Sequence, residues 1–223
     1  MSQSPLKWIA VLSMLIDHAG AVLFPQVRWM RIVGRLAFPI FAFFISEGFF
    51  YTRNRLRYFL RVFLLGAACQ AVYFIAMGDT YLNILLTFSL SILLMWLLDL
   101  AKRALAAGRS LHAAALSLAF AAAVIAVFLF TRRVSIDYGF FGIMTAVAPA
   151  LFDDRPRRLA AFSAGLIVLA SASGVVQSFS LLALPLLYLY NGKRGRGAPK
   201  YFFYIFYPAH LAALQLISWI VGP

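Results

Sequence analysis

Charged residues are scarce in this sequence, and acidic ones are scarcer still. Only 12% of the 223 residues are charged, 7 of them acidic against 20 basic, whereas 64% are hydrophobic. No polar stretch is long enough to form a soluble domain, and the longest connector, NGKRGRGAPK, has ten residues. This balance lies far from that of soluble proteins. We therefore predict one integral membrane domain that spans residues 1–223.

Several chemical motifs are also missing. The single cysteine, Cys69, excludes an intramolecular disulfide. No GxxxxGK[ST] run is present, which argues against nucleotide hydrolysis, and no Cys/His set has the spacing of a metal site. The first apolar segment holds Asp17 and His18 and lacks a small-x-small cleavage site, so we predict that it stays as the first helix.

Long apolar runs dominate what is present. They predict an all-α, polytopic transmembrane helical bundle with about nine spans, within a range of eight to ten. The predicted spans are 6–24, 36–50, 58–77, 84–100, 112–130, 139–152, 159–175, 178–190 and 201–221. The runs at 139–152 and 178–190 are short for a bilayer, so they are re-entrant or merge with their neighbours.

The net charge of +13 could suggest nucleic acid, but its distribution favours a membrane partner. Most basic residues fall in alternate loops, at 53–61, 102–109, 155–158 and 193–200. By the positive-inside rule these loops are cytoplasmic. The N-terminus is then predicted to be cytoplasmic and the C-terminus outside, with membrane lipid and no nucleic acid as partners.

Four ionisable residues lie inside predicted spans: Asp17, His18, Glu47 and His210. Such a group costs about 2.5 to 3.5 kcal/mol or more at the centre of a membrane helix, so each is a functional candidate. From the rise of a helix, His18 and His210 both lie roughly 15 to 16 Å from the cytoplasmic side. Two titratable groups at one depth can share a cavity. A purely structural hydrogen bond is the alternative for each.

Asp17 needs a countercharge, and the obvious ones are Arg31 and Arg35, spaced i, i+4 at the entry to the second helix. Together with Arg28 they crowd an outer loop that should be poor in positive charge. A buried acid beside this cluster predicts an ion pair. Asp99 is expected to pair at a helix end with Lys102 and Arg103.

Other polar positions leave two interpretations open. Tyr207 lies one turn before His210, and Pro208 removes an amide donor inside the last span. A stripe of Asn83, Thr87 and Ser91 follows one helix face, where hydrogen bonding between helices is the alternative to a functional role.

Five stretches carry a combined pattern: KWIAVLSMLIDHAG, RIVGRLAFPIFAFFISEGFFYT, SIDYGFFGI, YNGKRG and KYFFYIFYPAHL. Together they resemble the TraX family of conjugal-transfer and pilus-associated membrane proteins. The resemblance covers the whole chain, is strongest in the first 60 and last 35 residues, and is weak from 100 to 130. The family's motif positions correspond to Asp17, His18, Arg35, Pro39, Glu47, Gly48, Asp137, Gly139, Asn191, Gly192, Lys200, Tyr204, Tyr207, Pro208 and His210.

The resemblance implies acetylation of the N-terminus of pilin subunits, with acetyl-CoA as donor, in the bacterial inner (cytoplasmic) membrane. The family is also similar, more distantly, to multi-pass acyltransferases in which a membrane histidine supports acyl transfer. Conjugation and fimbrial assembly are the processes implied, and the acceptor is a pilin or a related extracytoplasmic molecule.

Acetyl transfer needs a base and a group that stabilises the oxyanion. We expect His18 as the base, Tyr207 or an outer arginine for the oxyanion, and His210 to orient the acceptor or to move its proton. An acetyl-histidine intermediate is a further possibility. The candidate catalytic residues are His18, His210, Asp17, Tyr207, Arg35 and Glu47. The candidate residues for binding acetyl-CoA are Lys193, Arg194, Arg196, Lys200, Asn191, Gly192 and Arg53; charge that only sets topology is the alternative.

Two other classes of function stay open. Buried acids, histidines and a proline-interrupted helix also mark proton-coupled transporters or flippases, although no internal repeat is found. A non-enzymatic scaffold for pilus assembly would tolerate substitutions at Asp17 and His18.

Overall fold

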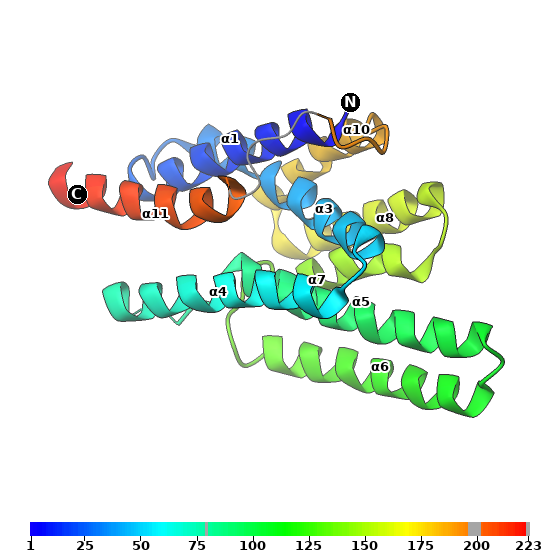
Figure 1. The fold of residues 1–223 in the computed structure, drawn as a ribbon. Helices are drawn as coiled ribbons and strands as arrows, with labels where there is room; N and C mark the ends of the chain where they lie inside the picture. The colour runs from blue at the N-terminus through cyan, green and yellow to red at the C-terminus, as the bar shows by residue number, and fades with distance from the viewer. Residues whose placement is uncertain (79, 196–201, 222–223) are drawn as a thin grey trace. The chain divides into compact units, whose positions relative to one another are not determined.

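The protein is built from α-helices joined by short connections (Figure 1). The computed structural model describes residues 1–78, 80–195 and 202–221. The helices are α1 (Gln3–Val22), α2 (Arg28–Gly34), α3 (Ala37–Tyr51), α4 (Arg55–Met77), α5 (Ile84–Ala106), α6 (Ser110–Thr131), α7 (Gly139–Val147), η1 (Ala148–Leu151), α8 (Arg155–Ser173), α9 (Val175–Ser178), η2 (Phe179–Leu182), α10 (Ala183–Tyr188) and α11 (Phe202–Val221). Within the described residues the only extended pairing is an isolated bridge between Leu82 and Ile136. The predicted all-α class is confirmed.

In the part of the chain that the structure describes, five helical segments are long and apolar enough to cross a membrane. They are Gln3–Val22, Arg28–Tyr51, Arg55–Ile75, Ile84–Ala106 and Ser110–Thr131. Three further apolar helical stretches, Gly139–Leu151, Val175–Tyr188 and Ile205–Ile220, are shorter. The predicted run at 178–190 is broken into α9, η2 and α10. The predicted total of nine spans and the cytoplasmic N-terminus therefore stay predictions.

Local sequence signals account for several helix ends. Asn54 precedes α4, and its side chain accepts a hydrogen bond from the backbone amide of Arg57 at 2.8 Å. Asn83 caps α5 in the same way, accepting from Leu85. Asparagine is favoured at such positions because its side chain satisfies an amide that the helix leaves unpaired. Gly78 ends α4 with a φ of 65°, a left-handed conformation that glycine adopts without steric cost.

The chain forms two compact units. The first comprises Met1–Phe41 and Leu166–Pro223, and the second Ala42–Gly165. In the first unit, α1 packs against α2 and against α11, so the first and last helices of the chain lie side by side (Figure 1). The sequence placed His18 and His210 at one depth without showing that their helices are neighbours, and the structure places α1 and α11 in contact. The single integral domain predicted above stays a prediction.

In the second unit, α5 is the central helix, with α4, α6 and α7 packed around it. Its polar stripe faces these neighbours. Thr87 Oγ1 donates to the carbonyl of Asp137 at 2.8 Å, and Ser91 Oγ contacts the carbonyl of Ile143 at 3.2 Å. Asn83 Nδ2 donates to the carbonyl of Gly66 at 2.9 Å. The stripe therefore joins helices through neutral hydrogen bonds, the structural alternative that the sequence left open.

The surface of α6 shows why this fold belongs in a membrane. Of its residues only Ala113 is buried, and large apolar side chains such as Leu111, Leu118 and Ile125 are exposed. A contiguous apolar face of this length would be an aggregation hazard in water, whereas lipid tails cover it without cost. With five helices of membrane-spanning length, the protein is a membrane protein.

Ion pairs tie the end of α5 to its neighbours. Asp99 pairs with Arg103 at 2.8 Å, as predicted, and with Arg55 at 3.2 Å. The predicted partner Lys102 is wrong: it contacts Asp153 at 2.6 Å instead, because it lies on another side of α5. The hydrogen bond from the Lys102 ammonium lowers the pKa of the Asp153 carboxyl below its ordinary value.

Candidate active site

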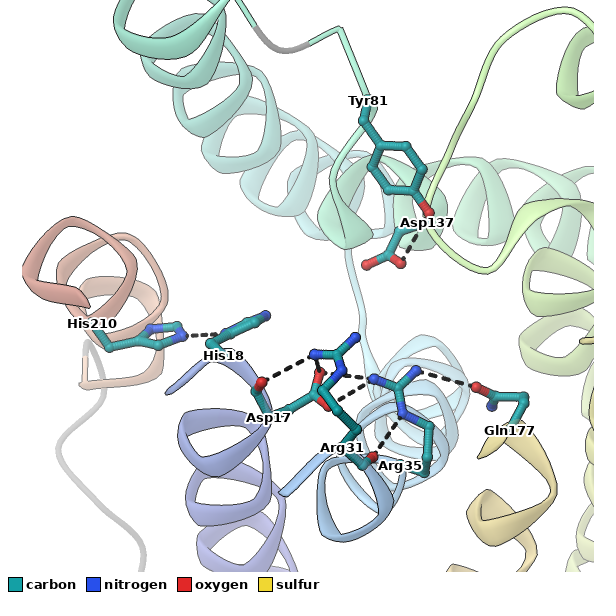
Figure 2. A network of polar contacts seen from close by, with 8 residues as sticks. All are labelled: Asp17, His18, Arg31, Arg35, Tyr81, Asp137, Gln177 and His210. Carbon is teal, nitrogen blue, oxygen red and sulfur yellow. Dashed lines mark hydrogen bonds and ion pairs between the residues drawn. The ribbon is translucent and has the colours of Figure 1, made fainter. Parts of the chain in front are cut away.

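Asp17 lies in the second half of α1 and is only 9% exposed. Both carboxylate oxygens accept from Arg35 Nη2, at 2.7 and 2.8 Å, and Oδ2 also pairs with Arg31 Nη1 at 2.9 Å (Figure 2). Arg31 Nη1 reaches the backbone carbonyl of Asp17 as well, at 3.0 Å. The predicted ion pair between the buried acid and the two outer arginines is confirmed. Two cations around one anion leave a net positive charge at this point.

A glycine makes this ion pair possible. Arg31 lies on α2 and Arg35 directly follows it, so both guanidinium groups approach Asp17 from one helix end. A methyl group added at Gly34 would lie 2.1 Å from Asp17 Oδ1. Only a residue without a side chain therefore lets the backbone of α2 come this close to the carboxylate.

Gln177 completes the polar set and was missed by sequence reasoning. Its Oε1 accepts from Arg35 Nη1 at 3.3 Å, and Arg35 Nε in turn donates to the carbonyl of Arg31 at 3.2 Å (Figure 2). Gln177 is buried on the short helix α9, which follows Gly174 with a φ of 85°. The signal in the sequence was slight: one polar residue after a glycine in an apolar run. Arg35 is thus held by partners from three elements.

His18, the next residue after Asp17, faces α11 and contacts His210. The distance between His18 Nδ1 and His210 Nε2 is 2.7 Å, and Figure 2 shows the two rings pointing toward one another. Their ring planes are 24° apart, with centroids separated by 5.0 Å. The sequence predicted these residues at one depth. The structure brings them into direct contact, although 192 positions separate them.

Neighbours on α11 hold the His210 ring. The Phe206 ring stacks on it almost in parallel, with centroids 4.7 Å apart, and the buried Tyr207 ring meets it edge-on at 5.9 Å. His210 Nδ1 lies 2.7 Å from the carbonyl oxygen of Phe206. Pro208 lies inside α11, and the helix continues through it. Tyr207 is therefore a neighbour of the histidine pair, as its spacing predicted.

Glu47 belongs to the second unit. It is only 5% exposed, and its Oε2 has no hydrogen-bond partner. The positive charges of Arg158 and Arg155, at the start of α8, act on its carboxyl group. Its predicted catalytic role stays a prediction.

The predicted phosphate-binding loop packs against the start of α1. The backbone amide of Asn191 donates to the carbonyl of Met1 at 2.8 Å. The backbone amide of Lys193 donates to the side-chain Oδ1 of Asn191 at 3.1 Å. The Lys193 carbonyl accepts from Gln3 at 2.8 Å. Two of the amides that a phosphate cradle would use are thus engaged already. In this part of the loop, the exposed side chains of Lys193 and Arg194 are the groups that an anion would contact.

The other predicted residues of this group are spread along the chain. Gly192, between the two engaged amides, has a φ of 76°. Arg53 is exposed between α3 and α4, in the second unit. Arg196 and Lys200 lie outside the described residues. Across residues 1–78, 80–195 and 202–221, no group of three or more His, Cys, Asp or Glu side chains could hold a metal ion.

With the fold and the site in view, comparison with known proteins identifies the family. The sequence profile described as "TraX protein" matches residues 2–218, nearly the whole chain. The chain belongs to the TraX family. The resemblance predicted from the sequence motifs is therefore confirmed, and both histidines and the Asp17 ion pair lie within the matched region.

Two curated proteins are similar to this TraX family member. One is the "Probable fimbrial assembly protein FimC, serogroup H1" of Dichelobacter nodosus, 30% identical over 244 residues that cover 94% of this chain and 92% of the relative. The other is the "Uncharacterized protein RP591" of Rickettsia prowazekii (strain Madrid E), 48% identical over 48 residues, which cover 22% of this chain and 19% of the relative. No solved structure matches.

Proposed function

We propose that this protein is a multi-pass acetyltransferase of the bacterial inner membrane. It transfers acetyl from acetyl-CoA to the N-terminus of a pilin subunit or a related extracytoplasmic acceptor, and His18 is the general base. The observation that supports this most is the contact of His18 Nδ1 with His210 Nε2 at 2.7 Å, beside an arginine cluster. A membrane helix gathers so many polar groups at one point only at considerable cost, which favours a chemical role.

The arginines supply what acyl transfer needs besides a base. When a nucleophile attacks a thioester, negative charge develops on the carbonyl oxygen, and fixed positive groups lower the barrier. Arg31 is the better candidate for this contact. Its side chain is 38% exposed, against 13% for Arg35, and its contacts with the Asp17 carboxylate and carbonyl both use Nη1. Arg35 anchors Asp17 instead.

The step itself is a proton-coupled acyl transfer. The acceptor's amine nitrogen forms a bond to the acetyl carbon, and its proton passes to His18 Nε2. The carbon–sulfur bond of the thioester breaks, and His18 returns the proton to the leaving thiolate. His18 ends as it began, so atoms and charge balance, and general acid–base catalysis of this kind contributes roughly 10² to 10⁴-fold in rate.

The donor and the acceptor are proposed from different observations. Acetyl-CoA carries phosphate groups, and the exposed Lys193 and Arg194 provide positive charge next to the start of α1. Arg196 and Lys200, which follow in the same connector of the sequence, are further candidates for that contact, and Arg53 stays a candidate from the sequence alone. A pilin acceptor is supported by the relative from Dichelobacter nodosus, whose name assigns it to fimbrial assembly.

The test is the intact mass of pilin subunits from cells that carry the protein, lack it, or carry a variant. We expect an acetyl-sized increment with the unaltered protein and none without it. His18→Ala should abolish the increment. His112→Ala is the matched control, because His112 is an exposed histidine near the start of α6 and should leave the increment intact.

Three other outcomes would contradict the role of His18 or favour a different function. Full acetylation in the His18→Ala strain would contradict the assigned base. No increment in any strain, combined with proton movement into vesicles without acetyl-CoA, would favour a transporter. Normal pilus assembly with both histidines replaced would favour a scaffold.

A further inference from the structure

The proton between the two histidines can be assigned from the contacts around them. At 2.7 Å, one of the two facing nitrogens, His18 Nδ1 or His210 Nε2, must carry a hydrogen and the other must offer a lone pair. The distance alone does not distinguish donor from acceptor. A third group does.

The carbonyl of Phe206 settles the direction. A carbonyl oxygen only accepts, so His210 Nδ1, 2.7 Å away, must be the protonated nitrogen. A neutral imidazole has one N–H, and His210 Nε2 therefore holds a lone pair. That lone pair accepts from His18 Nδ1–H. The single proton of His18 is thus on Nδ1, and its Nε2 is left as the free base.

We propose that His210 is a positioning residue, which with the Phe206 carbonyl holds His18 as the Nδ1–H tautomer and leaves Nε2 to take the acceptor's proton. The assignment of the tautomer rests on the contacts alone. The role of Nε2 as the base rests on the proposed acetyl transfer.

Both rings are fixed well enough to keep this direction. His210 is only 6% exposed and stacks on Phe206 within 9° of parallel. His18 follows Asp17, whose carboxylate and carbonyl are both bound by arginine. Rotation of either ring would break a partly buried hydrogen bond, and this loss opposes the rotation.

The same chain of bonds serves the reaction. When His18 Nε2 takes the proton from the attacking amine, the ring becomes an imidazolium with two N–H groups. Its Nδ1–H remains bonded to His210 Nε2, which shares the positive charge. The bond from acceptor nitrogen to acetyl carbon forms, the carbon–sulfur bond breaks, and the Nε2 proton leaves with the thiolate. His210 neither gains nor loses a proton overall.

Nitrogen NMR of the full-length protein in lipid vesicles tests the tautomer without any substrate. The chain has three histidines, so labelling this residue type with ¹⁵N and comparing His112→Gln and His18→Gln variants assigns the signals. We expect His18 to be protonated at Nδ1, with a coupling through the hydrogen bond to an unprotonated Nε2 of His210. A His18 proton on Nε2, or no coupling, would overturn the proposal.

Two substitutions at position 210 separate positioning from packing. His210→Leu removes the acceptor, so His18 should become a mixture of tautomers, and kcat should fall on the order of 10²-fold with little change in KM. His210→Gln carries an amide oxygen near the place of Nε2, so it should restore part of the Nδ1–H tautomer of His18 and part of kcat. A His18 tautomer that stays unchanged in the Leu variant would overturn the role of His210.

The two proposals fail separately. If the NMR result is as expected but the unaltered protein transfers no acetyl group, the proposed function fails while the tautomer assignment stands. If acetyl transfer occurs and His18 is protonated on Nε2, the proposed function stands and this inference fails.

Discussion

Helices α1 and α5 both carry polar side chains along a membrane-length apolar segment, but the two use them differently. On α5, Thr87 and Ser91 are neutral and donate to backbone carbonyls of the 137–143 segment. On α1, Asp17 is charged and is held by two arginines, and His18 meets a second histidine. One helix is joined to its neighbours by neutral hydrogen bonds, and the other gathers ionisable groups around Asp17 and His18.

The difference shows what separates a packing contact from a site. A neutral hydrogen bond between membrane helices contributes only about 0.6 to 2 kcal/mol and satisfies its members. A buried carboxylate costs more than that to insert, so α1 needs Arg31, Arg35 and Gln177 around it. In the tautomer proposed above, His18 Nε2 still offers a lone pair after all these contacts. This available lone pair, rather than polarity alone, distinguishes α1 from α5.

The largest effect on stability should come from breaking the buried ion pair. Arg35→Met leaves Asp17 with only the more exposed arginine, and we expect a loss of about 3 to 5 kcal/mol in the free energy of unfolding. Thermal unfolding of the purified protein in detergent measures it. Adding Asp17→Asn should recover part of the loss, because the buried charge is then removed as well.

Two neighbouring arginines are the matched controls for that variant. Arg31→Met should cost about 1 kcal/mol, since its side chain is 38% exposed. Arg28→Met, at the exposed start of α2, should change little. Equal effects at all three positions would mean that the ion pair is not what holds α1 to α2.

A smaller loss of stability is expected from substitution of Gly34, which packs directly against the Asp17 carboxylate. Gly34→Ala forces a methyl group against Asp17 and should cost about 1 to 3 kcal/mol, together with most of the acetylation. Gly66→Ala is the control in α4, where the nearest atoms lie 3.0 Å or more from an added methyl. If Gly34→Ala were as mild as the control, the close approach would not matter to the site.

The smallest effect should occur on α5. Thr87→Val keeps the shape of a fully buried side chain but removes its hydrogen bond to Asp137, so we expect a loss of about 1 kcal/mol. Acetylation per folded molecule should be unchanged. Loss of acetylation with stability retained would show that α5 belongs to the site, and the contrast with α1 would disappear.

Much of the α1 site was predictable from the sequence because electrostatics restricts the choices. A buried acid needs a countercharge, and Arg31 and Arg35 form an i, i+4 pair that is out of place in its outer loop. The common depth of His18 and His210 followed from the helical rise. Their direct contact did not, since nothing in the sequence shows that the first and last helices are neighbours.

Other features depended on tertiary packing that leaves no local signal. Gln177 is one polar residue in an apolar run, and only the fold brings it to Arg35. Lys102 was assigned to Asp99 by proximity in sequence, but its side of α5 faces Asp153. The helical class was clear, whereas breaks such as those between α9 and α10 made the span count hard to predict, because short apolar runs fit both spanning and broken helices.

The most direct test of the account is label transfer by the purified protein. The protein in lipid nanodiscs, which expose both faces, is mixed with acetyl-labelled acetyl-CoA and a purified pilin subunit, and label on the pilin N-terminus is measured. The account predicts label with the unaltered protein and with His112→Gln, and a rate lower by about 10² to 10⁴-fold with His18→Gln. Label transfer at an equal rate in the His18→Gln variant would contradict it.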